Sequence, residues 1–231
     1  MNTYLWLLRR ELWEYRSIWT LPAWVGFGLL LGTMLGTLDA GTGANHLTIS
    51  FGFGALGREP RNVFLFSAIA ATFYLLMTLY VGWYLLDCLY ADRKDRSVLF
   101  WKSMPVSDRD TVLVKLVTAM VVIPMVFYGF AQLTTAAHAI FFSLRSGGRA
   151  ALDPWNAGLW TGMQLLWLYA IFTGALWFLP VAGWMMLVSA WGRRAVFGWT
   201  LAVPVIAVVA ERLVLGTQRV SDAIGERLWA G

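Results

Sequence analysis

The chain has 231 residues, of which 59% are apolar and 13% charged, and its mean hydropathy is +0.63. Soluble domains carry about 25% charged and about 45–50% apolar residues, so a water-soluble fold of this size could not bury so much apolar surface. Disorder requires low hydrophobicity, and a disulfide-stapled module requires more than the single cysteine Cys88. The composition therefore predicts an all-α, polytopic integral membrane protein.

The net charge of +5 does not indicate a nucleic-acid-binding protein. The basic residues lie in short patches between apolar runs, as they do at membrane edges, and do not form a continuous stripe. The 14 tryptophans agree with this interpretation, because indole rings favour the headgroup layer.

Residues 1–16 are predicted to form an amphipathic helix that lies in the membrane interface. Its apolar side chains recur at spacings of three and four: Leu5, Leu8, Leu12 and Tyr15. Trp6 and Trp13 widen this face, and the charged residues occupy the rest of the wheel. The alternative is a frayed extension of the first span, but its charges would be costly any deeper in the membrane.

Residues 17–231 are predicted to form a transmembrane domain. A helix needs about 20 apolar residues to cross the hydrocarbon core, and the uncharged runs give five spans. They cover residues 18–38, 62–90, 111–142, 157–190 and 195–215. The fourth run could be a hairpin of two helices, but its middle lacks polar turn residues, which favours one long helix kinked near Pro180.

The distribution of Lys and Arg predicts a cytoplasmic amino terminus, because 11 of the 18 basic residues fall on that side of the five spans. Residues 1–16 contain acidic side chains and the next apolar run is too long for a cleavable signal, so the first span is read as an anchor. Five spans place the carboxyl end on the outside.

A stripe of small residues, Gly28, Gly32 and Gly36, follows one face of the first span. Small residues allow helix backbones to approach closely in lipid. The stripe could pack against another span of the same subunit or form a dimer interface.

The cytoplasmic loop 91–110 carries the most specific signal. A dense mix of both charges is followed by apolar and aromatic residues, Phe100 and Trp101 among them, and then by Pro105. Ser107 and Asp110 match the Ser-x-x-Asp pattern that begins a helix. An exposed helix with Phe-Trp at its centre needs a cover, either lipid headgroups or a partner protein.

This loop, Asp92-Arg-Lys-Asp-Arg-Ser-Val-Leu-Phe-Trp-Lys-Ser-Met-Pro-Val-Ser-Asp108, resembles the corresponding loop in permease subunits of bacterial ABC exporters of the type-2 class. The opening Leu7-Leu-Arg-Arg-Glu-Leu-Trp-Glu14 is similar to their amino-terminal interfacial helix. The resemblance implies a subunit of the bacterial inner membrane that forms the translocation path as a pair of permeases. It also implies a separate ATPase subunit, which binds ATP and Mg²⁺, and no cofactor in this chain.

By this resemblance, a short coupling helix docks on the ATPase through Arg93, Lys94, Asp95, Arg96, Ser97, Leu99, Phe100, Trp101 and Lys102. The resemblance implies that the amino-terminal helix flanks it with Arg9, Arg10, Glu11 and Glu14. Such permeases usually have six spans with both ends in the cytoplasm, so either this sequence lacks a final helix or the subunit is short.

The absence of certain motifs from the sequence bears on which functions this chain could have by itself. The sequence has no Gly-x-x-x-x-Gly-Lys-Ser/Thr phosphate loop, so ATP hydrolysis is assigned to a partner. His46 and His138 have no partners at metal-ligand spacing. A membrane-embedded structural or assembly factor remains an alternative to the permease. A small intramembrane enzyme is a weaker one, because the spans offer only isolated polar groups.

Three of those isolated polar groups, His138, Gln132 and Gln164, lie within predicted spans. A neutral histidine hydrogen-bonded to a neighbouring helix is commoner than one that lines a pathway. The two glutamines could hold helices together or contact a substrate. The aromatic, methionine-rich spans suit an amphipathic or apolar cargo, but lipid-facing surfaces have the same composition.

Overall fold

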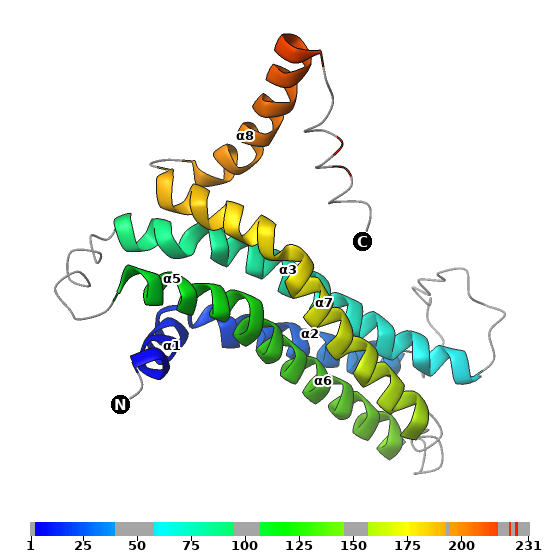
Figure 1. The fold of residues 1–231 in the computed structure, drawn as a ribbon. Helices are drawn as coiled ribbons and strands as arrows, with labels where there is room; N and C mark the ends of the chain where they lie inside the picture. The colour runs from blue at the N-terminus through cyan, green and yellow to red at the C-terminus, as the bar shows by residue number, and fades with distance from the viewer. Residues whose placement is uncertain are drawn as a thin grey trace. The chain divides into compact units, whose positions relative to one another are not determined.

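A computed structural model describes residues 3–39, 58–94, 107–145, 157–192 and 195–216, together with 222 and 225. Every element in these segments is helical (Figure 1). The elements are α1 (Thr3–Glu14), α2 (Ser17–Asp39), α3 (Arg58–Lys94), α5 (Asp108–Val117), η1 (Thr118–Val122), α6 (Ile123–Arg145), α7 (Ala157–Trp191), α8 (Val196–Ala210) and η3 (Glu211–Leu215). Within the described residues, five helical stretches are long and apolar enough to cross a membrane, which confirms the prediction of an all-helical chain with five such stretches.

The helix α7 is continuous from Ala157 to Trp191 and contains Pro180. The prediction of one long helix in place of a hairpin is therefore confirmed. A proline in a helix interior removes one backbone hydrogen bond, which the remaining turns of a helix of 35 residues tolerate.

The chain packs as two compact units, whose boundaries fall inside α1, α3, η1 and α7. The first unit comprises Met1–Leu7, Tyr80–Met120 and Phe172–Gly231, and the second comprises Leu8–Leu79 and Val121–Ile171.

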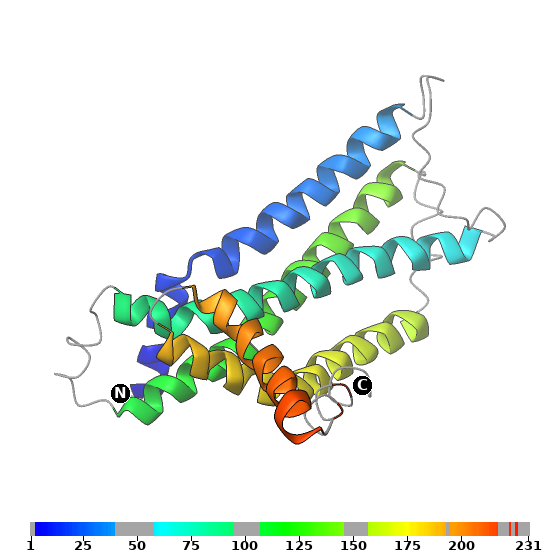
Figure 2. The same ribbon diagram turned by 90° about the horizontal axis from the view of Figure 1, so that it is seen from above.

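In the second unit, α2 packs along α6 (Figures 1 and 2). The close approach occurs at Gly26, where an added Cβ would lie 2.5 Å from Oγ1 of Thr134. One helical turn further along α6, the ring of His138 is buried against Thr33 of α2, with Nε2 3.2 Å from the threonine hydroxyl. A glycine and a pair of polar side chains thus hold these two helices together.

In the first unit, the last turns of α3 and α7 and the first turn of α8 share an apolar core. Leu86, Val188 and Val196 are buried at its centre. Ala195 begins the turn into α8 with φ of 52°, a left-handed conformation, and the indole N–H of Trp184 donates to the carbonyl of Thr200 at 3.3 Å. These contacts hold the first turn of α8 against the end of α7.

Between α5 and α6 the helix widens into one π-helical segment, Thr118–Val122. It ends two residues before Pro124, whose ring nitrogen cannot donate to a carbonyl one turn earlier. A π-segment is one of the ways in which a helix accommodates such a break. The segment is packed tightly, since Thr118 and Ala119 are fully buried.

One side of α1 is buried against the rest of the protein, and its tryptophans lie on exposed sides. Leu7, Glu11 and Tyr15, spaced four residues apart, are buried, whereas Trp6 and Trp13 are exposed. Of the predicted apolar face, Leu5 is exposed, Leu8 and Leu12 are half-buried and Tyr15 is buried, so the placement of this face in the membrane interface stays a prediction.

Candidate functional site

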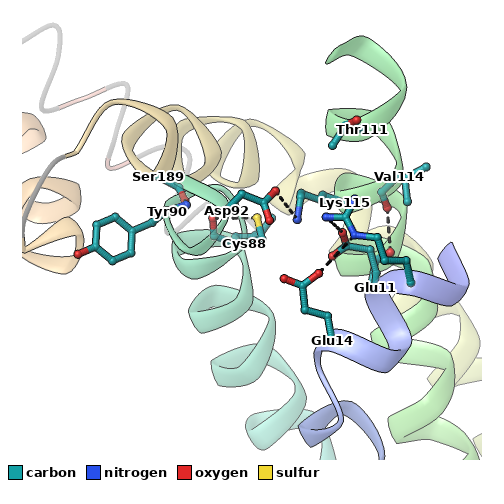
Figure 3. A network of polar contacts seen from close by, with 12 residues as sticks. Glu11, Glu14, Cys88, Tyr90, Asp92, Thr111, Val114, Lys115 and Ser189 are labelled. Carbon is teal, nitrogen blue, oxygen red and sulfur yellow. Dashed lines mark hydrogen bonds and ion pairs between the residues drawn. The ribbon is translucent and has the colours of Figure 1, made fainter. Parts of the chain in front are cut away.

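The two ends of the predicted coupling loop are joined by a buried ion pair. Asp92 lies in the last turn of α3, and Lys115 lies in the last turn of α5. The Lys115 ammonium is 3.2 Å from a carboxylate oxygen of Asp92, and their side chains are 0% and 7% exposed, respectively (Figure 3). Burial removes both charges from water, so each depends on its polar neighbours for compensation.

The last turn of α3 is also tied to the end of α7 through Ser189. The Ser189 hydroxyl accepts a hydrogen bond from the backbone N–H of Tyr90 at 3.0 Å and donates to the carbonyl of Leu86 at 2.7 Å. This side chain therefore bridges two consecutive turns of α3 from the neighbouring helix (Figure 3).

Arg93 adds a second tie between the same two helices. Its guanidinium donates to the backbone carbonyl oxygens of Ser189 and of Gly192, the latter at 2.8 Å. Helix carboxyl ends expose unpaired carbonyls and carry partial negative charge, so a guanidinium there caps α7. The side chain of Arg93 is half-buried and holds α3 to α7, and Lys94 is exposed; the ATPase contacts that the resemblance implies for both stay predictions.

The start of α5 is capped as the sequence predicted. The Ser107 hydroxyl accepts a hydrogen bond from the N–H of Asp110 at 3.1 Å. The phenol of Tyr4, in α1, donates to the Asp110 carboxylate at 2.7 Å. This hydrogen bond, with the nearby negative charge, raises the pKa of Tyr4 above its usual value of 10.0.

The other α1 residues implied by the resemblance lie on different sides of that helix. Arg9 is exposed and its guanidinium lies 4.9 Å from the Trp13 ring centre. Arg10 lies 3.6 Å from the carboxylate of Glu11 and 3.4 Å from that of Glu14. Glu11 is buried, and its implied role at a partner interface stays a prediction.

The rest of the predicted coupling helix, Asp95, Arg96, Ser97, Leu99, Phe100, Trp101 and Lys102, lies outside the described residues. The site that can be described is therefore its base. There, α3 and α5 are joined by an ion pair, and α3 and α7 by Ser189 and Arg93.

The predicted glycine stripe does not mediate contact within the described part of the chain. A Cβ added at Gly28 or Gly32 would meet no atom within 4 Å, and the side of α2 that approaches α6 carries Gly26 instead. Gly36 belongs to α2, and its surroundings are outside the description.

The isolated polar groups are hydrogen-bonded within the protein, His138 to Thr33 of α2 and to its own helix, and the two glutamines to each other across α6 and α7. His138 is hydrogen-bonded to the carbonyl of Thr134 at 2.8 Å through Nδ1, and because a carbonyl only accepts, Nδ1 carries the proton. Gln164 accepts from the phenol of Tyr128 at 2.8 Å and from the amide of Gln132 at 2.7 Å. These groups hold helices together, one of the two roles that the sequence left open.

Lys115 and Ser189 are the members of the site that sequence reasoning missed. Lys115 was counted as a charge at the start of a span, and Ser189 is a small polar residue in a long apolar run. The sequence did carry one signal for this ion pair. Lys115 lies inside the predicted third span, where a lysine needs a partner, and the preceding span ends close to Asp92. Among the described residues, no group of three or more His, Cys, Asp or Glu side chains is arranged to hold a metal.

Comparisons with known protein families, with curated proteins and with solved structures found no match to this chain.

Proposed function

We propose that this chain is the membrane-spanning permease subunit of an ABC exporter, coupled to a separate ATPase subunit. The observation that carries the proposal is the braced base of the loop that resembles a coupling helix. Asp92 and Lys115 join the helix that precedes the loop to the helix that follows it. A loop that only connected two spans would not require a buried ion pair at its base.

The bracing suits the transmission of movement. A displacement of residues 95–106 by a partner would act on α3 and α5 together, because the ion pair links their ends. It would also reach α7 through Ser189 and Arg93. Packed and hydrogen-bonded elements move as units, so three helices would respond to one docking event.

In this proposal the five apolar helices lie in the bacterial inner membrane, with the loop on the cytoplasmic side, and a second permease copy completes the path. The exposed Trp6 and Trp13 of α1 would rest in the headgroup layer. ATP and Mg²⁺ would be bound by the partner, because this sequence contains no phosphate loop.

The test is copurification of the ATPase with tagged permease. An open reading frame adjacent to the gene that encodes a phosphate loop identifies the ATPase to co-express. We expect Trp101→Ala to weaken its binding by about 2 kcal/mol or more, because aromatic anchors at the centre of an interface commonly cost that much. Phe100→Ala should have a smaller effect in the same direction.

Trp24→Ala is the matched control, because Trp24 is an exposed tryptophan on α2 and should not affect ATPase binding. Undiminished copurification with Trp101→Ala would mean that Trp101 only rests among headgroups. If wild-type permease binds no ATPase and no substrate stimulates hydrolysis, the transport proposal fails and a structural or assembly role is favoured.

A further inference from the structure

An open groove lies between α3 and α7 within the second unit. Its volume is about 310 Å³, and four residues of each helix line it. The groove is open where the lining side chains are small, at Ala70, Ala71 and Ala170. Its walls are the larger side chains of Tyr74, Met163 and Trp167. None of the eight lining residues is charged.

Two hydrogen-bond donors of the groove are unused within the described residues. The indole N–H of Trp167 and the phenol of Tyr74 have no hydrogen-bond partner there, although Trp167 packs against the ring of Tyr128 at 6.0 Å between centres. Tyr74 is 38% exposed and Trp167 is half-buried, and in the apolar interior of a membrane, where no water is present, an unmade hydrogen bond is costly. A ligand with a neutral acceptor would supply the missing partner.

The size and charge of the groove select the kind of ligand. Small-molecule pockets span about 300–1,000 Å³, so this groove is at the lower end and suits a compact molecule with a single apolar body. A two-chain phospholipid is too large, and its charged headgroup would find no countercharge among the lining residues. The groove lies toward the Arg58 end of α3 and the Ala157 end of α7, away from the predicted coupling loop.

We infer that this groove binds a neutral, compact amphipathic molecule that carries a carbonyl-type acceptor. The apolar body would lie over the three alanines, and the acceptor would receive hydrogen bonds from Trp167 and Tyr74. In identifying this molecule as the class of exported cargo, the inference rests on the proposed function.

The probe is 6-propionyl-2-dimethylaminonaphthalene, a neutral ketone whose fluorescence shifts to the red when its carbonyl accepts a hydrogen bond. Binding to the full chain in lipid nanodiscs should be saturable above the partition of the probe into lipid. Ala71→Trp fills the groove and should weaken binding at least about tenfold, because the groove cannot hold both. Ala68→Trp, on the same turn of α3 but outside the groove, should leave binding unchanged.

Trp167→Phe and Tyr74→Phe separate hydrogen bonding from packing. Each keeps the ring and removes one donor, so each should weaken binding by about three- to tenfold. Each should also shift the fluorescence of the bound probe toward the blue, which a merely structural change would not do. These variants keep the inference falsifiable if Ala71→Trp fails to fold.

Absence of saturable binding, or equal binding to the Ala71→Trp and Ala68→Trp variants, would overturn the groove as a ligand site. Groove-dependent binding that leaves hydrolysis by the copurified permease–ATPase complex unchanged would overturn the identification as cargo, while the proposed function stands. If no ATPase copurifies, the proposed function fails, and the binding measurements alone decide the groove.

Discussion

Lys115 and Asp92 are both removed from water, and their attraction at 3.2 Å is part of what offsets the loss of hydration. Such a pair contributes little compared with two well-packed apolar residues, because desolvation cancels much of the Coulomb attraction. Removing one partner is different, since the other charge remains buried. The pair therefore specifies how α3 and α5 meet more than it adds to net stability.

Lys115→Met should therefore lower the free energy of unfolding by about 3–5 kcal/mol, because it leaves the buried carboxylate without this ammonium. The double variant Asp92→Leu/Lys115→Met should recover most of that loss. Reversible unfolding in mixed detergent micelles measures both. Lys94→Met is the control, because Lys94 is exposed and its loss should change stability by no more than about 0.5 kcal/mol. A double variant as unstable as the single one would show that the pair has no special role.

The sequence could place Asp92 next to the loop, and it could predict the cap at Ser107. It could not pair Asp92 with Lys115, because the 22 intervening positions include the loop, and no local periodicity connects the two ends. The sequence could not predict the role of Ser189 either. A single serine in an apolar run gives no sign of a specific role. Its role becomes visible only when the structure shows that its hydroxyl joins the N–H of Tyr90 to the carbonyl of Leu86.

At the scale of the helices, the close approach of α2 to α6 depends on Gly26. An added Cβ there would lie 2.5 Å from Thr134 Oγ1, whereas a Cβ at Gly28 would meet nothing within 4 Å. The two glycines are two residues apart on one helix and differ only in what faces them. They form a matched pair for testing the packing.

Gly26→Ala should lower the melting temperature in detergent, with a loss of about 1–3 kcal/mol, because the helices must separate or Thr134 must turn away. Gly28→Ala should be neutral or stabilising by up to about 1 kcal/mol, since alanine favours the helix. Adding Thr134→Ala to Gly26→Ala removes the clashing hydroxyl and should restore much of the loss. If both glycine variants behave alike, the close approach at Gly26 is not limiting.

The sequence predicted the helices better than their ends and faces. The uncharged run through Pro180 indicated a single helix, and α7 is one. The second stretch was expected over residues 62–90, but α3 runs from Arg58 to Lys94 because a helix can continue past its apolar section with charged residues. The burial of Glu11 beside Arg10 could not be predicted, because a charged residue in an amphipathic pattern is expected on the solvated side.

At the scale of the whole molecule, most of the apolar surface of the long helices is uncovered. The most apolar windows of α7 and of the α8–η3 stretch bury only 11% of their residues, and that of α2 buries 17%. Monomeric soluble proteins rarely expose contiguous apolar surface on this scale, which supports the proposed membrane location. It also leaves room for a second copy of the chain beside α2.

The exposed glycines of α2 are the best candidates for such a contact. Gly28 and Gly32 lie one turn apart with open space above them, and small residues at this spacing let two helices in lipid approach closely. Within the described residues they contact nothing, and pairing between subunits through them stays a prediction. This agrees with the proposed pair of permeases.

We therefore expect native mass spectrometry of the wild-type protein to show two permease copies, and Gly28→Leu or Gly32→Leu to shift the population to single copies. Leucine holds the two backbones apart and removes the close contact on which association in lipid depends. Gly162→Leu is the matched control, because Gly162 is an exposed glycine of α7 with equally open surroundings. A single copy in the wild type would contradict the pair of permeases. A pair that survives both α2 variants would place the interface elsewhere, since neither leucine could then lie between the two chains.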